Sequence, residues 1–221
     1  MESKTSRGIR KRIIDLSQLL ATGMPTYPGD LPEPLIRSAV KNNIRTSTIR
    51  IGSHYGTHID APAHFFREGL TLLDYPLSRF FGQAVCLDKT ESASGKIELT
   101  KNESALIEQL EPDWILIRSG FDRYWAQPCY FSKHPFLSEE LIMRLLETSV
   151  IGIGVDFPSI DAADAEVTDY PVHRRWLGAG RLAVENLCNL QSLPQHEMFE
   201  FCALPLKTDT EGAPVRALAF L

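Results

Sequence analysis

Three of the six histidines in the chain lie within eleven residues, at His54, His58 and His64, with Asp60 among them. Imidazole and carboxylate groups are common ligands of divalent transition metals. Two neutral imidazoles and one carboxylate leave such an ion positively charged, with open positions for water. An ion held in this way lowers the pKa of its water to about 7 and polarises a carbonyl group. We therefore predict a catalytic metal site at His54, His58 and Asp60.

The spacing of these residues requires a bent backbone. Four extended residues span roughly 13 Å, whereas both imidazoles must come within about 2 Å of one ion. A straight helix would bring His54 and His58 together but would turn Asp60 to the far side. Gly56 reaches conformations closed to other residues, and Pro62 disfavours helix at the residue before it. We predict a strand end that turns into an irregular loop and carries the ligands inward.

His64, four residues after Asp60, is the candidate general base and acid. An imidazole accepts and donates a proton near neutral pH without a large shift in its pKa. A single histidine is more often a structural or surface residue than a ligand. The clustering of three histidines with an aspartate is what favours a functional site.

Residues 54–65 follow the pattern His-x-Gly-Thr-His-x-Asp-x-Pro-x-His-Phe. This pattern resembles the signature of the cyclase family of metal-dependent hydrolases, which includes bacterial kynurenine formamidase and isatin hydrolase. The resemblance covers nearly the whole chain, from residue 15 to residue 217, and is most specific at 54–65. It implies the family's single-domain cyclase-like fold, of the swivelling β/β/α type, assembled as a homodimer or homotetramer.

His173 and Glu185 gain a role only from this resemblance. On residue type alone, an isolated histidine is usually structural and a glutamate is usually a solvated charge. The family carries a Pro-x-His and a downstream Glu-Asn-Leu, which match His173 and Glu185 here. Its kynurenine formamidase members use these two residues on a second metal, and the first-site aspartate, here Asp60, bridges the ions. The resemblance thus implies one or two ions per chain, with zinc and manganese both compatible with these ligands.

Tyr27 is the candidate substrate-binding residue. Composition alone makes residues 24–30 a surface loop, but the family often has Trp-Pro-Gly-Asp here, facing the substrate, and Tyr27 takes the place of that tryptophan. The aromatic residues between 120 and 135 form either a packed surface loop, or the wall of a substrate pocket or a subunit contact. Asp156 and Asp161 follow an apolar strand, where ligands bind in open α/β sheets, but turn capping explains them equally well.

These observations favour a metal-dependent hydrolase of a small, non-peptide carbon–nitrogen amide bond, with an arylformamidase of the kynurenine formamidase type as the specific candidate. Water attacks the carbonyl, and His64 takes its proton and returns it to the leaving nitrogen. Opening of an isatin-like lactam and a cyclase or dehydratase reaction are alternatives at the same site. A metal-binding protein without turnover would close its ligand shell, which would leave His64 without a task.

Composition sets further limits. The 221 residues, 43% hydrophobic and 23% charged, fit one soluble domain at 12–221 after a flexible N-terminus at 1–11. The net charge of −5 provides no basic face for a nucleic acid. No apolar stretch is long enough for a membrane span or secretory signal. Four scattered cysteines without a CxxC pair indicate thiols in a reducing compartment, so a cytoplasmic location is expected.

The order of strand and helix patterns predicts an α/β domain with a mixed sheet. Thr100 and Glu103 form a capping box that starts a helix ending near residue 110, and a second helix begins after Ser138. Residues 46–51 alternate polar and apolar side chains, which predicts a half-buried strand leading directly into His54. The other expected strands are 12–17, 83–88, 114–118 and 150–156, followed by a C-terminal hairpin of 200–206 and 215–220.

Overall fold

The computed structural model describes residues 12–30, 33–92 and 95–221, so the prediction of a flexible segment at 1–11 lies outside it. A mixed eight-stranded sheet forms the centre, in the order β1-β12-β11-β5-β7-β9-β10-β4, and a further pairing of β12 with β4 closes it into a ring. Its strands are β1 (Ile13–Asp15), β4 (His58–Asp60), β5 (Phe81–Asp88), β7 (Trp114–Arg118), β9 (Gly152–Val155), β10 (Leu182–Glu185), β11 (Met198–Pro205) and β12 (Gly212–Phe220).

The parallel strands β5, β7, β9 and β10 form the buried half of this sheet. Successive residues of β7 point to opposite faces, so Trp114 joins one hydrophobic cluster and Ile115 the other. Gly152 in β9 leaves room for the Trp114 ring, because a Cβ there would lie 2.3 Å from it. The Gly-x-Gly of this strand therefore serves packing. The predicted mixed sheet and its strands at 83–88, 114–118 and 150–156 are confirmed.

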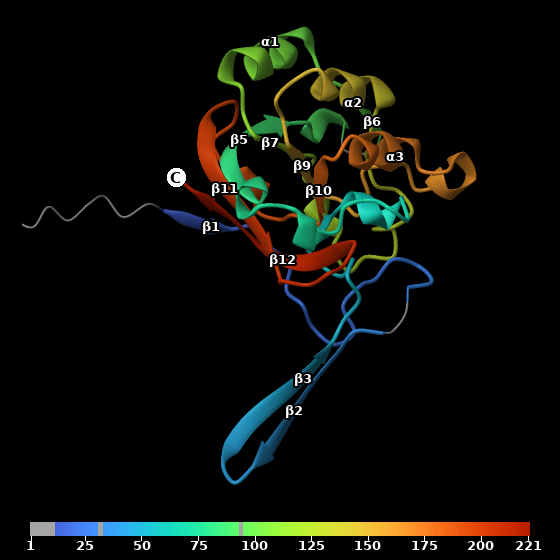
Figure 1. The fold of residues 1–221 in the computed structure, drawn as a ribbon, viewed down its shortest axis with the longest axis vertical. Helices are drawn as coiled ribbons and strands as arrows, with labels where there is room; N and C mark the ends of the chain where they lie inside the picture. The colour runs from blue at the N-terminus through green and yellow to red at the C-terminus, as the bar shows by residue number, and fades with distance from the viewer. Residues whose placement is uncertain (1–11, 31–32, 93–94) are drawn as a thin grey trace, which may run out of the picture.

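Three helices cover one side of the sheet, α1 (Lys101–Leu110), α2 (Glu139–Leu146) and α3 (Pro171–Gly178), as Figure 1 shows. The predicted capping box of α1 is confirmed, since the Thr100 side chain accepts from the Glu103 N–H and the Glu103 carboxylate accepts from the Thr100 N–H. The Ser138 side chain caps α2 by accepting from the Leu141 N–H. Short 3₁₀ turns lie at η1 (Pro62–His64), η2 (Leu72–Asp74), η3 (Leu77–Arg79), η4 (Thr90–Ser92), η5 (Phe121–Tyr124), η6 (Ala165–Thr168) and η7 (Leu190–Ser192), and β6 (Lys96–Ile97) pairs with β8 (Phe136–Leu137).

Strands β2 (Leu35–Lys41) and β3 (Ile44–Arg50) form a separate hairpin that projects from the body of the molecule (Figure 1). Asn42 and Asn43 connect them with φ values of 51° and 62°. Two positive φ angles are what a tight hairpin turn with the twist of its strands requires, and asparagine tolerates them.

The prediction of a half-buried strand at 46–51 leading directly into His54 is wrong. Every residue of β3 is exposed, and β3 ends at Arg50, so a loop separates it from His54. The alternating pattern is present, but the hairpin stands clear of the sheet. The C-terminal hairpin is confirmed, with β11 and β12 paired over six residue pairs. In the described part of the chain, no helix has the length and apolar character to span a bilayer.

Candidate metal centre

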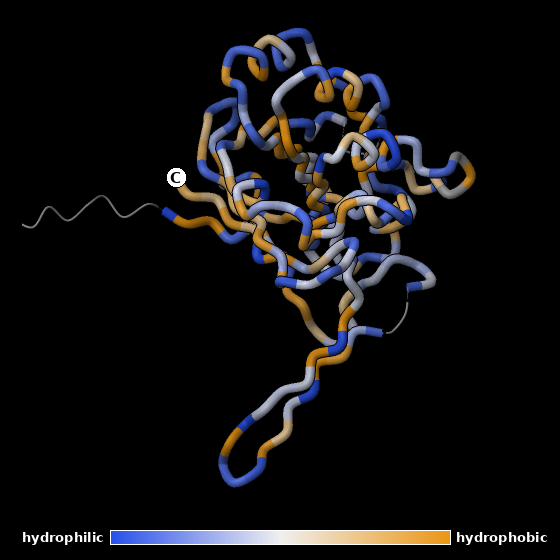
Figure 2. The backbone as a smooth tube through the Cα atoms, viewed as in Figure 1, coloured by the Kyte–Doolittle hydropathy of each residue, from blue (hydrophilic) through white to orange (hydrophobic). Residues whose placement is uncertain are grey.

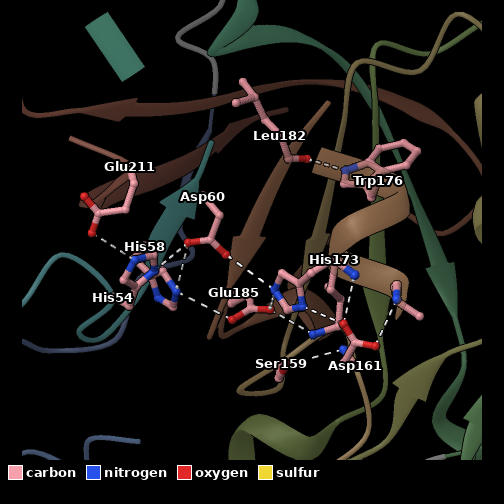
Figure 3. A network of polar contacts seen from close by, with 12 residues as sticks. His54, His58, Asp60, Ser159, Asp161, His173, Trp176, Leu182, Glu185 and Glu211 are labelled. Atoms are coloured by element: carbon pink, nitrogen blue, oxygen red, sulfur yellow. Dashed lines mark hydrogen bonds and ion pairs between the residues drawn. The ribbon is translucent and has the colours of Figure 1, made fainter. Parts of the chain in front are cut away.

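His54, His58 and Asp60 point toward one another, as Figure 3 shows. His54 lies in the loop after β3, whereas His58 and Asp60 lie on the same face of β4. Gly56 between the histidines has a φ of 63°, which confirms the predicted bend. Asp60 Oδ1 lies 2.7 Å from His54 Nδ1 and 3.4 Å from His58 Nε2. One potential ligand atom from each residue falls within 4.8 Å of the other two, which suits a single ion.

A second group of ligand atoms meets the first at Asp60. His173 comes from the first turn of α3 and Glu185 from the end of β10. His173 Nε2 lies 3.2 Å from Glu185 Oε1 and 3.8 Å from Asp60 Oδ2. The antiparallel pairing of β10 with β4 sets Glu185 opposite His58, so that their side chains also approach to 3.5 Å. Asp60, His173 and Glu185 form a second set with ligand atoms within 4.8 Å of one another.

The burial and hydrogen bonding of Asp60 show whether these residues fit a metal ion. Its side chain is only 1% exposed, and within the described chain its Oδ2 accepts no hydrogen bond. A buried carboxylate oxygen without a partner is costly, so such atoms usually face a hydrogen-bond donor or a cation. Imidazole nitrogens and carboxylate oxygens together are a donor set that suits zinc or manganese. The donor set and the unpartnered oxygen therefore fit one or two divalent ions.

Each of the three histidines is held by an acceptor at its outer nitrogen. His58 Nδ1 lies 2.9 Å from the carbonyl oxygen of Gly56. His173 Nδ1 lies 2.7 Å from Asp161 Oδ2, and His54 Nε2 lies 3.3 Å from Glu211 Oε1. Acceptors of this kind fix the tautomer and ring orientation of histidines that bind metals. The outer nitrogen of each ring is thus occupied while the inner one faces Asp60.

Sequence reasoning missed these supporting groups. For Asp161 the sequence leaves a ligand role and turn capping equally open, although its position after the apolar strand is a usable signal. Glu211 lies in the turn before β12 and carried no signal in the sequence. Asp156 does not cap its own turn, because its carboxylate accepts from the N–H groups of Ser119 and Gly120 on another segment of the chain.

In this cluster, burial and neighbouring charges shift the pKa of each group in opposite directions. Burial lowers the pKa of His54, but the carboxylates of Asp60 and Glu211 outweigh it and raise that pKa to about 10. Burial raises the pKa of Asp60, but the surrounding histidines outweigh it and hold that pKa well below its ordinary value. The hydrogen bond from His54 lowers the pKa of Glu211 to about 2. The carboxylates therefore stay ionised and attract positive charge, whether as protons on the imidazoles or as a cation.

His64 lies beside the cluster in η1. Its ring centroid is 4.0 Å from that of His54 and 6.2 Å from that of His173. Desolvation by the surrounding side chains outweighs the attraction of Asp60 and lowers the pKa of His64 to about 4, so the expectation that this imidazole has no large shift in its pKa is wrong. The residue as a whole is exposed, but its ring packs beside His54 and makes no hydrogen bond within the described residues. It is thus a neutral imidazole at neutral pH, free to accept a proton.

Tyr27 lies in the turn formed by residues 27–30. Its ring meets that of Phe131 edge to face, with centroids 5.7 Å apart. Asp30 closes this turn by donating its N–H to the Tyr27 carbonyl. Burial raises the pKa of Asp30, although the nearby His54 and His58 act in the opposite direction. The turn therefore lies close to the first ligand group, with Phe131 beside it.

The aromatic loop packs and also reaches the site. The Tyr130 hydroxyl, fully buried, donates to Asn186 Oδ1 at 2.8 Å. Asn186 in turn donates its amide to the Gly56 carbonyl at 2.9 Å, beside the bond from His58. Of the two readings of residues 120–135, packing describes Tyr130, whereas the contact of Phe131 with Tyr27 agrees with a pocket wall.

A family model described as "Putative cyclase" matches residues 14–162. The kynurenine formamidase of Bacillus mycoides (strain KBAB4) is 32% identical over 210 residues, which are 93% of this chain and 95% of that protein. The kynurenine formamidase of Salinibacter ruber (strain DSM 13855 / M31) is 28% identical over 215 residues, covering 93% and 96% of the two chains.

Two solved structures share the fold. Isatin hydrolase A from Labrenzia aggregata, bound to benzyl benzoate, gives a TM-score of 0.81 at 25% identity and covers 96% of this chain and 94% of its own. A protein described as a potential metal-dependent hydrolase with cyclase activity gives 0.77 at 27% identity and covers 95% and 98%. The predicted cyclase-like fold is confirmed, and the chain belongs to the cyclase family of metal-dependent hydrolases.

Proposed function

We propose that this chain is a metal-dependent hydrolase of small, non-peptide amides, with an arylformamidase activity of the kynurenine formamidase type as its best assignment. One observation carries the proposal. The buried Asp60 is shared by two groups of metal-ligand atoms, and the free imidazole of His64 lies at their edge. The formamidases and isatin hydrolase among the relatives support amide hydrolysis as the reaction at such a site.

His54, His58 and Asp60 would hold one ion, and Asp60, His173 and Glu185 the other. A divalent ion, zinc or manganese, lowers the pKa of water and polarises the amide carbonyl. His64 accepts a proton from the attacking water and returns it to the leaving nitrogen. Its position beside His54 supports both steps, because a neutral ring without a hydrogen bond is available to a molecule that enters the site.

Tyr27 and Phe131 support an aromatic substrate. Their edge-to-face pair stands on the side of the site where the Tyr27–Asp30 turn approaches His54, and aromatic walls suit a flat ring. N-formylkynurenine, an aryl formamide, is therefore the first candidate, which would place the enzyme in tryptophan catabolism in the cytoplasm. Opening of an isatin-like lactam is the second candidate, because of the likeness to isatin hydrolase A. We expect a homodimer or homotetramer.

Metal analysis and a substrate panel test this function. The purified protein should contain about one or two divalent ions per chain. Its kcat/KM should be highest for N-formylkynurenine and other aryl formamides, and lower for isatin and for lactones. Removal of the metal with a chelator should abolish hydrolysis, and added zinc or manganese should restore it. A metal-loaded protein that hydrolyses none of these compounds would support the metal-binding alternative.

Two variants separate the ligand groups. His173→Ala should lose the second ion but keep the first, because His173 belongs to one set only. Asp60→Ala should lose both ions, because its carboxylate belongs to both sets. Metal content after dialysis measures the difference, and circular dichroism checks that both variants are folded. Equal metal loss in the two variants would contradict the shared role of Asp60.

A further inference from the structure

Asn186 is a buried polar residue to which the proposed reaction gives no role. It directly follows β10, whose residues 182–184 are apolar and whose last residue is Glu185. Figure 2 shows apolar segments at the centre of the molecule, where Figure 1 places β10. Asn186 is only 4% exposed, and a buried amide is costly unless its donors and its acceptor have partners. The partners of its side chain therefore indicate its role.

The direction of the Asn186 amide follows from its two partners. The Gly56 carbonyl oxygen can only accept a hydrogen bond, so the atom 2.9 Å from it is the amide nitrogen of Asn186. The Oδ1 atom then faces the Tyr130 hydroxyl, which donates to it at 2.8 Å. Burial and the nearby carboxylate of Asp156 raise the pKa of Tyr130 well above its ordinary value, so this hydroxyl keeps its proton. The amide therefore has one orientation, which two partners fix.

The Asn186 amide meets the His58 ring at the Gly56 carbonyl. His58 Nδ1 lies 2.9 Å from the same carbonyl oxygen and 3.5 Å from the Asn186 amide nitrogen. Because the carbonyl only accepts, Nδ1 carries the proton of the neutral ring and Nε2 has the lone pair. Nε2 is the atom that faces Asp60 and Glu185, at 3.4 Å and 3.5 Å (Figure 3). The Gly56 carbonyl therefore determines which nitrogen of His58 is available to an ion.

The Gly56 carbonyl needs this support because the backbone bends there. Gly56 has a φ of 63°, and a residue without a Cβ offers little resistance to rotation of the peptide that follows it. The hydrogen bond from the Asn186 amide opposes that rotation. The Thr57 hydroxyl, in addition, donates to the Asn186 carbonyl oxygen at 2.6 Å. Asn186 thus holds residues 56 and 57 through both its side chain and its main chain.

We propose that Asn186 is a positioning residue for the first ion, because its amide fixes the Gly56 carbonyl and, through it, the nitrogen that His58 offers to the metal. The inference rests on the metal site of the proposed function. Asn186 belongs to neither set of ligand atoms, so its loss should weaken metal binding without removing a ligand. Loss of a group that orients a metal-binding histidine usually lowers the affinity by about 10–100-fold.

The effect should be confined to the first ion, although Asn186 adjoins Glu185 of the second ligand group. Glu185 Oε1 accepts from the Ile160 N–H at 2.8 Å, a bond that does not involve Asn186. The backbone N–H of Asn186 donates to the Phe157 carbonyl at 3.1 Å, and every residue type except proline has this donor. The end of β10 should therefore keep its place when the Asn186 side chain is removed.

Three substitutions test the proposal on the full-length protein. Asn186→Gly removes the side chain and lets the backbone keep its φ of 59°. Asn189→Gly is the matched control, because Asn189 has the same φ and also donates its amide to a backbone carbonyl, that of Asp15 at 3.0 Å. Tyr130→Phe keeps Asn186 but removes the hydroxyl that orients its amide. Circular dichroism checks that each protein is folded.

Two parent variants separate the ions. His173→Ala keeps all the ligands of the first ion, and His54→Ala keeps all those of the second. Zinc titration of the metal-free His173→Ala protein should show a dissociation constant that Asn186→Gly raises by about 10–100-fold, that Tyr130→Phe raises by less, and that Asn189→Gly leaves unchanged. In the His54→Ala protein, Asn186→Gly should leave the dissociation constant unchanged.

NMR of the zinc-loaded protein provides a readout that does not depend on affinity or turnover. The Nδ1 proton of His58 should exchange slowly with water in the wild type and in Asn189→Gly, because a hydrogen bond holds it, and rapidly in Asn186→Gly.

Unchanged affinity for the first ion in Asn186→Gly, or an equal loss for both ions, would overturn the inference while the hydrolase assignment stands. If Asn186→Gly does not fold, Tyr130→Phe decides by the same titration, and unchanged affinity there would overturn the inference. A wild type that binds no zinc or manganese would overturn the proposed function and the inference together.

Discussion

Asp161 Oδ2 lies 2.8 Å from the backbone nitrogen of His173 and 2.7 Å from its Nδ1, so one atom fixes both the start of α3 and the direction of the imidazole. The residue that precedes α3, Tyr170, gives the helix no side-chain cap. Asp161 supplies the cap from a distant loop, and its Oδ1 accepts the N–H of Val172. Helix capping and ligand orientation are therefore one structural feature here.

Asp161→Asn should weaken binding of the second ion by about 10–100-fold, the usual effect of removing a group that orients a ligand. Both carboxylate oxygens accept hydrogen bonds, so an amide must turn its NH₂ toward a donor on one side. Titration of the metal-free protein with zinc measures the affinity. Asp164→Asn, at an exposed position in the same loop, is the control. Unchanged affinity in Asp161→Asn would show that α3 alone orients His173.

His64→Ala should keep its metal and lose about 10²–10⁴-fold in kcat, the usual contribution of a general base or acid. The ring touches His54 but belongs to neither ligand set. Steady-state kinetics with an aryl formamide and metal content on the same preparation measure the two effects. His196→Ala, an exposed histidine elsewhere on the chain, is the control. Full turnover in His64→Ala would remove its proposed role in proton transfer.

The elements that local sequence fixes could be predicted. The capping box at Thr100 and Glu103 and the apolar runs of β7 and β9 depend on neighbours in the chain, and their strands and helix are confirmed. The position of the β2–β3 hairpin could not be predicted in this way. The alternating pattern of β3 is typical of a strand with one buried face, but the pattern does not show whether that face packs on the sheet, and in the structure it does not.

The candidate site likewise contains some residues that a local sequence pattern indicates and others that it does not. Residues 54–64 form a dense local pattern that indicates a metal by itself, although the metal roles of His173 and Glu185 remain predictions that came from family resemblance. The groups that orient the histidines were missed, because their contacts depend on how the chain folds around the site and not on a pattern of neighbouring residues. Glu211 reaches His54 from 157 residues away. Such a contact follows from sheet pairing, and no local pattern reports it.

The buried carboxylate of Glu103 predicts how the stability of the fold changes at acid pH. Its buried carboxylate accepts from the Lys89 ammonium and from Thr100. Burial raises the pKa of Glu103, but these donors outweigh it and hold the pKa below its ordinary value of 4.5. A lowered pKa means that the ionised form contributes stability above pH 4.5, and that this contribution is lost as the pH falls further.

Glu103→Gln should therefore lower the free energy of unfolding at pH 7 and flatten its decline below pH 4.5, because Lys89 loses its buried partner. Urea unfolding at a series of pH values measures both effects. Glu108→Gln, exposed on the same helix, should follow the wild-type curve. If the two variants have the same pH dependence, the buried pair does not determine acid stability.

Alanine substitutions at Gly56 and Gly23 compare backbone strain at the metal site with the same kind of strain elsewhere in the chain. Both have positive φ, 63° and 74°, so alanine at either position should cost about 1–2 kcal/mol of stability. A Cβ at Gly56 would also lie 2.5 Å from a methyl group of Leu20, whereas nothing lies within 4 Å at Gly23.

Gly56 lies between His54 and His58, and its carbonyl oxygen is hydrogen-bonded to the His58 ring. Gly56→Ala should thus weaken metal binding as well, whereas Gly23→Ala should lower thermal stability alone. Zinc titration and thermal unfolding of both variants measure the contrast, and full metal affinity in Gly56→Ala would mean that the bend does not set the spacing of the two histidines.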